Sequence, residues 1–177
     1  MEGKDWMELA GQKNQLAKVM EGNRYGERFG LRLTEEEAKL LMQERARCLK
    51  EQHRVEFGES ILPKLMQAFC DSDYIRGEDY AEVLGRLQEI FYLFKNESMD
   101  LLTDDELLTF MREQYDETCF GELDYLEGTC LPLFADAVRA GYRGYQQTGG
   151  KGEFEQFDIV QRWDKDLYLQ ALANQMD

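Results

Sequence analysis

Apolar side chains recur along this chain at the spacing of one helix face. The clearest stripe is formed by Tyr80, Leu84, Leu87, Phe91 and Phe94, which are separated by alternating steps of four and three residues. Side chains at this spacing lie one above another on an α-helix. The stripe therefore predicts a buried, amphipathic helix in the middle of the chain.

Two helix starts carry a capping box, in which a threonine is followed three residues later by a glutamate. The pairs are Thr34 with Glu37 and Thr103 with Glu106. In this motif the threonine side chain and the glutamate side chain each accept a hydrogen bond from the other residue's backbone N–H. Acidic residues follow both starts, where they complement the positive end of the helix dipole. Gly121 is placed to end the second of these two helices.

Three shorter apolar stripes predict three further helices, and Pro132 inside the last of them predicts a kink or a fresh start near Gly128 or Thr129. The glycine-rich and aromatic stretch 22–33 predicts a structured loop. No hairpin signal or convincing repeat is present. The predicted helices lie near residues 5–20, 34–54, 60–71, 78–95, 103–119 and 122–146.

This pattern predicts an all-α, single-domain bundle of five to six helices over residues 1–147. The sequence TGGKG at 148–152 predicts a glycine hinge. Residues 148–177 are then a loosely attached tail, in which residues 163–172 have the pattern of a short amphipathic helix, either docked on the bundle or free of it.

Charge is distributed unevenly along the chain. The net charge is −15, yet residues 1–57 hold 11 basic and 11 acidic side chains, so the whole excess lies after residue 57. Residues 96–136 hold 12 acidic side chains and one basic side chain. Such a field repels phosphate groups, which disfavours direct binding to nucleic acid or to an anionic membrane.

The charged N-terminal stretch is unlike a signal peptide, and no apolar run reaches the length of a membrane span. The four cysteines, which are Cys48, Cys70, Cys119 and Cys130, include no CxxC pair. These features predict a cytoplasmic protein with reduced, mostly buried thiols.

The usual catalytic and binding motifs are incomplete. His53 is the one histidine, and it falls in the basic last turn of a predicted helix, where an exposed histidine is ordinary. Residues 144–149 have the glycine spacing of a P-loop, but Gly150 stands in place of its lysine. Residues 71–82 resemble a calcium loop that has Arg76 in place of its glycine. We therefore assign no catalytic residue, cofactor or metal ligand, and favour a non-enzymatic role.

Pairs of carboxylates on one helix face leave one enzymatic alternative. All-α, magnesium-dependent nucleotide phosphohydrolases hold their metal with such pairs. Few basic residues accompany these pairs to bind a polyphosphate. The pairs are Asp79 with Glu82, Glu113 with Asp116 and Glu117, and Asp124 with Glu127.

The favoured interpretation is an interaction protein that binds a basic protein partner through its acidic face. A mimic of DNA that occupies a nucleic-acid-binding protein is a variant of this hypothesis. Charge reversal of the Asp104 to Glu106 segment is its sequence-based test. The predicted partner-binding residues are Glu97, Asp100, Asp104, Asp105, Glu106, Glu113 and Asp116.

Several short blocks of the chain resemble an uncharacterised family of small acidic helical proteins from Firmicutes, DUF6323. The resemblance implies a bacterial cytoplasmic protein and brings no activity, cofactor or site residue with it. Two of the blocks are polar-aromatic segments placed just after predicted helices. The blocks are Gly30 to Thr34, Arg54 to Gly58, Ala68 to Ser72, Ile90 to Ser98, Asp104 to Met111 and Gly121 to Leu131.

Overall fold

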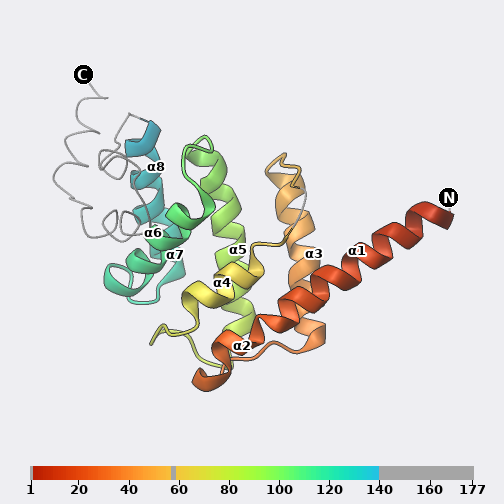
Figure 1. Cartoon of the computed structure of the whole chain (residues 1–177). Helices are drawn as coiled ribbons and strands as arrows, with labels where there is room; N and C mark the ends of the chain where they lie inside the picture. Colours follow the sequence, from red (N-terminus) through yellow and green to blue (C-terminus); the bar gives the residue numbers. More distant parts are fainter. Residues whose placement is uncertain (1, 57–58, 140–177) are drawn as a thin grey trace, which may run out of the picture. The chain divides into compact units, whose positions relative to one another are not determined.

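The computed structural model of the chain describes residues 2–56 and 59–139, and every regular element in these ranges is helical (Figure 1). The all-α prediction is confirmed. A 3-10 turn at Glu27–Phe29 follows α2, and a π-helical turn at Leu126–Cys130 follows α7. The α-helices are α1 (Glu2–Glu21), α2 (Asn23–Gly26), α3 (Glu35–Glu51), α4 (Leu62–Phe69), α5 (Tyr80–Glu97), α6 (Asp104–Glu117), α7 (Leu123–Tyr125) and α8 (Leu131–Arg139).

The chain divides into two compact units, residues 1–92 and residues 93–177, with the boundary inside α5. We call them unit 1 and unit 2. The predicted hinge at 148–152, the predicted tail and its short helix lie outside the described residues. None of the described helices combines the length and the apolar character that a membrane crossing requires.

In unit 1, α1 packs against α3 and α4, and α2 packs against α4. The fully buried side chains of this unit include Leu62 and Leu65 on α4 and Leu84 on α5. Residues 22–33 were predicted as a loop, but they begin with α2 and the 3-10 turn. Buried Asn23 fixes the following segment, because its amide accepts a hydrogen bond from the Leu33 N–H at 2.8 Å and donates one to the Leu33 carbonyl at 3.0 Å.

Helix ends follow the local chemistry of the sequence. Both predicted capping boxes are present, with Thr34 and Thr103 as the N-caps. The helix predicted to reach residue 54 ends at Glu51, because His53 adopts a left-handed conformation with φ of 55°. The Arg54 N–H then bonds to the Leu49 carbonyl at 2.8 Å, as in a Schellman motif.

In unit 2, the π-helical turn contacts α6, α7 and α8. The rings of Phe110 and Phe134 stack with their centroids 3.7 Å apart, between α6 and α8. No fresh helix start is found near Gly128 or Thr129, because α7, the π-helical turn and α8 follow one another without a gap. The irregularity is the π-helical turn itself, which ends two residues before Pro132.

Candidate protein-interaction surface

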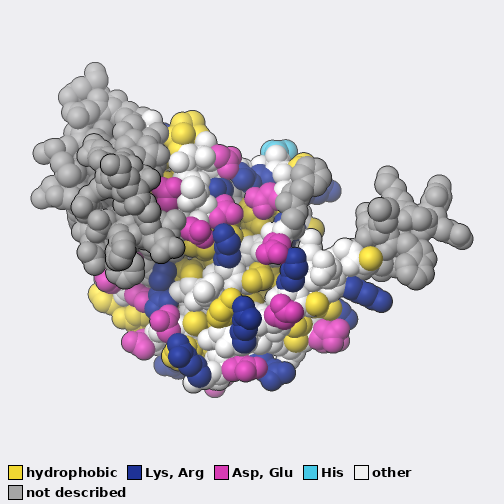
Figure 2. Space-filling model, in the orientation of Figure 1, with side chains coloured by type: hydrophobic (Ala, Val, Ile, Leu, Met, Phe, Trp, Pro, Cys, Tyr) yellow, Lys and Arg dark blue, Asp and Glu magenta, His cyan; other side chains and the backbone are white. Residues whose placement is uncertain are grey.

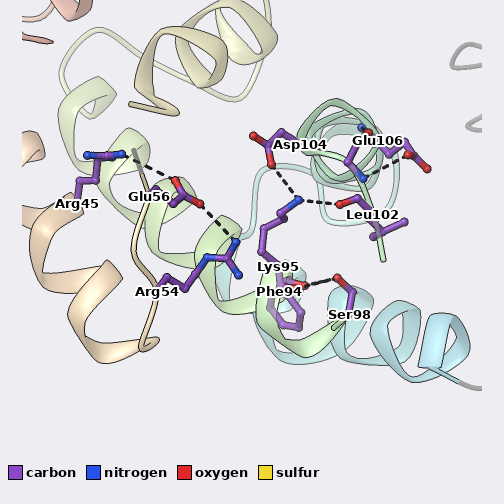
Figure 3. Close-up of polar contacts among 10 residues, drawn as sticks. Arg45, Arg54, Glu56, Phe94, Lys95, Ser98, Leu102, Asp104 and Glu106 are labelled. Atoms are coloured by element: carbon purple, nitrogen blue, oxygen red, sulfur yellow. Dashed lines mark hydrogen bonds and ion pairs between the residues drawn. The ribbon is translucent and has the colours of Figure 1, made fainter. Parts of the chain in front are cut away.

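Lys95 anchors the start of α6 in unit 2 (Figure 3). Its side chain lies on α5 and is 7% exposed. The ammonium group donates a hydrogen bond to the Leu102 carbonyl at 2.7 Å and forms an ion pair with Asp104 at 2.9 Å. Ser98 donates to the Phe94 carbonyl at 2.7 Å. A buried cation requires such partners, so Asp104 has a structural role.

A second polar cluster lies in unit 1, around Glu56 (Figure 3). One oxygen of Glu56 lies 3.8 Å from Nη2 of Arg45, and the other lies 3.4 Å from Nη2 of Arg54. Nε of Arg45 also donates to the hydroxyl of Tyr92 at 3.2 Å. Burial raises the pKa of Tyr92 to about 12, so the hydroxyl stays protonated. The polar segments after α3 and at the end of α5 therefore make internal contacts.

Acidic residues at the N-terminal end of α6 are used by the fold. Glu106 closes the capping box, because its side chain accepts a hydrogen bond from the Thr103 N–H at 3.2 Å. Asp104 pairs with Lys95, and Asp105 lies exposed in the same first turn. Carboxylates at this end are stabilised by the helix dipole. Local stability thus accounts for these three predicted partner-binding residues.

Glu97 and Asp100 lie at the C-terminal end of α5. Oε2 of Glu97 forms an ion pair with Nη1 of Arg139 at 3.1 Å, and the same arginine contacts Asp136. Asp100 has φ of 54°, and its N–H bonds to the Lys95 carbonyl at 2.9 Å. Its backbone closes the turn after α5 in the same way that Arg54 closes the turn after α3.

At the C-terminal end of α6, three carboxylates meet the negative end of the helix dipole. Asp116 is paired with Arg112 at 2.7 Å, but the last turn holds no basic residue. Oε2 of Glu113 is buried and has no hydrogen-bond partner in the described part of the chain. Burial raises the pKa of Glu113 to about 7, and the nearby carboxylate of Glu117 adds to the increase. The fold leaves negative charge here poorly compensated.

Two exposed aromatic side chains follow this helix end. Phe120 is 65% exposed and Tyr125 is 47% exposed. Phe120 has φ of 49°, a conformation that non-glycine residues adopt rarely. The carboxylates of Glu117, Glu122 and Asp124 are exposed beside them in the sequence. We call these five residues the acidic aromatic surface.

At the lower left of the face shown in Figure 2, hydrophobic and acidic side chains lie next to one another, with basic side chains among them. The acidic character of residues 113–125 was expected from the sequence, and the exposure of Phe120 and Tyr125 was not. A sequence signal was available for one of them, since Phe120 falls outside the apolar stripe of α6 and directly precedes the stop glycine Gly121.

The described residues do not gather metal-binding side chains into a cluster. They contain no group of three or more His, Cys, Asp or Glu side chains placed to hold a metal ion. His53, the one histidine of the chain, is exposed. A groove of about 420 Å³ between α1 and α3 has no carboxylate, histidine, thiol or hydroxyl side chain among its lining residues. It is lined by Gln12, Lys13, Gln15, Leu16, Lys39, Met42, Gln43, Arg45 and Ala46.

Comparison with known proteins places the chain in a family and goes no further. Residues 18–144 match the model of DUF6323, a family of unknown function. Neither the curated proteins nor the solved structures contain a match. The matched range includes both polar clusters and the acidic aromatic surface.

Proposed function

The chain belongs to the DUF6323 family, whose function is unknown, and we propose from its surface chemistry that it is a non-enzymatic interaction protein. It binds a basic protein partner through the acidic aromatic surface at the C-terminal end of α6. The observation that carries this proposal is the exposure of two aromatic rings, Phe120 and Tyr125, in a segment that also exposes three carboxylates and follows a helix whose last turn has no basic residue.

The electrostatic part of the proposal rests on the helix dipole. Anionic side chains near the C-terminus of a helix are destabilising, whereas a cation placed there is stabilising. An arginine or lysine of a partner that approaches Glu113 and Glu117 supplies the missing cation. Binding would relieve a repulsion that the isolated chain has to tolerate.

The aromatic part of the proposal concerns affinity. A few aromatic side chains provide most of the binding energy at typical interfaces, and charged residues around them mainly set orientation and association rate. Phe120 is suited to the first role because most of its ring is exposed and its backbone is held in a turn. Glu122 and Asp124 are suited to the second.

The test uses four immobilised forms of the chain to retain proteins from the native host at low salt. The forms are wild type, Phe120→Ala, the triple variant Glu117→Lys, Glu122→Lys, Asp124→Lys, and the control Leu40→Ala. Leu40 on α3 is 60% exposed, which matches Phe120. We expect wild type and Leu40→Ala to retain the same partner. Loss of a hot-spot side chain costs about 2 kcal/mol, so Phe120→Ala should bind roughly 30-fold more weakly.

The partner's affinity should also fall as salt is raised from low to physiological ionic strength, because exposed charges are screened. Circular dichroism checks that each variant keeps its helical content. A partner that all four forms retain equally would contradict the proposed surface. If the wild type retains no protein at low salt, the proposed function is wrong.

The acidic test segment predicted from sequence, Asp104 to Glu106, is a poor choice for this experiment. Asp104 neutralises buried Lys95, and Glu106 belongs to the capping box. Reversing these charges would destabilise α6, so any loss of binding would have two explanations.

A further inference from the structure

Two thiols lie in contact in unit 2. The sulfur atoms of Cys119 and Cys130 are 3.5 Å apart. Cys119 is buried directly after α6, and Cys130 is half-buried at the end of the π-helical turn. Neither belongs to a disulfide. Ten residues separate the two cysteines in the chain, among them Phe120 and Tyr125.

We propose that Cys119 and Cys130 are a redox modification site, in which the two thiols close reversibly into an intramolecular disulfide. The oxidant is a low-molecular-weight disulfide such as oxidised glutathione. This inference concerns the chain alone, so it stands or falls independently of the proposed partner.

The geometry requires a small local adjustment. A disulfide bond is about 2.05 Å long, so the sulfur atoms have to approach each other by roughly 1.5 Å. Cys130 lies on a π-helical turn, a local widening of the helix that frequently occurs at functional sites. Within the same turn, a Cβ added at Gly128 would meet no atom within 4 Å, so this side of the turn is open. We expect the π-helical turn to make most of the adjustment.

Exposure sets the order of the two chemical steps. The thiolate of half-buried Cys130 attacks the oxidant, forms a mixed disulfide with one half of it, and releases the other half as a thiolate. The Cys119 thiol then loses its proton to solvent, and its sulfur attacks the sulfur of Cys130. The Cys119–Cys130 bond forms, the mixed disulfide breaks, and the second half of the oxidant leaves as a thiolate. Two protein thiols are oxidised and one small disulfide is reduced.

Burial makes the second step slow at neutral pH. It raises the pKa of Cys119 to about 12, and the neighbouring Cys130 thiol adds to the increase. The thiolate fraction of Cys119 therefore rises about tenfold for each unit of pH below that value. The mixed disulfide at Cys130 should accumulate first and then convert, faster at pH 9 than at pH 7.

The experiment treats the folded, full-length chain with oxidised glutathione, blocks the remaining thiols with an alkylating agent, and maps tryptic peptides by mass spectrometry. Trypsin cuts after Arg112 and Arg139, so Cys119 and Cys130 remain in one peptide, whereas Cys48 and Cys70 fall in two others. We expect the peptide 113–139 to be lighter by two hydrogen atoms and unalkylated. The peptides of Cys48 and Cys70 should be alkylated, and dithiothreitol should reverse the change.

Two single variants assign the steps. Cys119→Ser should stop at the glutathione adduct on Cys130, and Cys130→Ser should show neither the adduct nor the intramolecular bond. Should a variant fail to fold, the wild type unfolded in urea provides the comparison, because unfolding removes the preference for this pair. Persistent accumulation of the adduct alone at pH 9, or a bond to Cys48 or Cys70 in the folded chain, would overturn the proposal.

Discussion

The two ends of α6 carry the same kind of side chain in opposite electrostatic settings. At the N-terminal end, Asp104 pairs with Lys95 and Glu106 closes the capping box. At the C-terminal end, Glu113 has a buried oxygen without a hydrogen-bond partner among the described residues, and Glu117 lies beside it. The first group of carboxylates stabilises the helix, whereas the second group opposes its dipole.

This difference distinguishes carboxylates that stabilise the fold from carboxylates that are available to a partner. Both groups belong to one acidic stretch in the sequence, where their composition is indistinguishable. Among the described residues, only the C-terminal group is accompanied by exposed aromatic side chains, Phe120 and Tyr125. One end of the helix therefore uses its carboxylates for stability, and the other end is the one we propose for binding.

The largest effect on this contrast is expected from Glu113→Gln. The pKa of Glu113 is raised in the folded chain, so its contribution to stability is present below its ordinary value near pH 4.5 and is lost as the pH rises through about 7. The variant should therefore be more stable than wild type at pH 8, by on the order of 2 kcal/mol, and should lose this advantage toward pH 4.5. Urea unfolding at both pH values measures the difference.

Glu122→Gln is the matched control for that experiment, since Glu122 is exposed in the following loop. It should change the free energy of unfolding little at either pH. Equal stability of Glu113→Gln and wild type at pH 8 would show that the Glu113 carboxylate is well solvated.

A smaller effect, of the opposite sign, is expected from Thr103→Ala at the other end of the helix. The substitution removes the side-chain acceptor of the Glu106 N–H, which lies 3.1 Å away. Loss of an N-cap costs about 1 kcal/mol. Thermal and urea unfolding measure this loss.

Thr109→Ala, in the interior of the same helix, is the control. It should be nearly neutral, because the higher helix propensity of alanine offsets the loss of the threonine side chain. Equal costs at Thr103 and Thr109 would contradict a specific capping role.

The smallest effects test the dipole directly through two charge reversals. Glu117→Lys should stabilise the fold and Asp105→Lys should destabilise it, each by about 0.3–1 kcal/mol. Both side chains are exposed, which makes them a matched pair at the two ends of α6. Melting temperatures at low salt measure the shifts, and high salt should reduce both. Shifts of the same sign would show that overall net charge, and not the dipole, dominates.

Local sequence was enough to predict much of the fold. The apolar stripe of α5, both capping boxes and the irregular turn before Pro132 depend on residues within a few positions of one another. The same local signals misplaced the end of α3, because a histidine and not a glycine occupies the left-handed position. Counting charges along the sequence located the acidic region. It could not show which of the acidic residues are neutralised, because Lys95 and Arg139 pair with residues from other segments.

The sequence by itself determined an all-α chain, its capped helices, and a net charge concentrated after residue 57. Only the tertiary structure decided which carboxylates are paired, that one oxygen of Glu113 is buried, and that the sulfur atoms of Cys119 and Cys130 touch. The physical reason is the distance along the chain over which each interaction acts. Capping and helix periodicity act over one or two turns, whereas burial and ion pairing depend on which distant side chains the packed helices bring together.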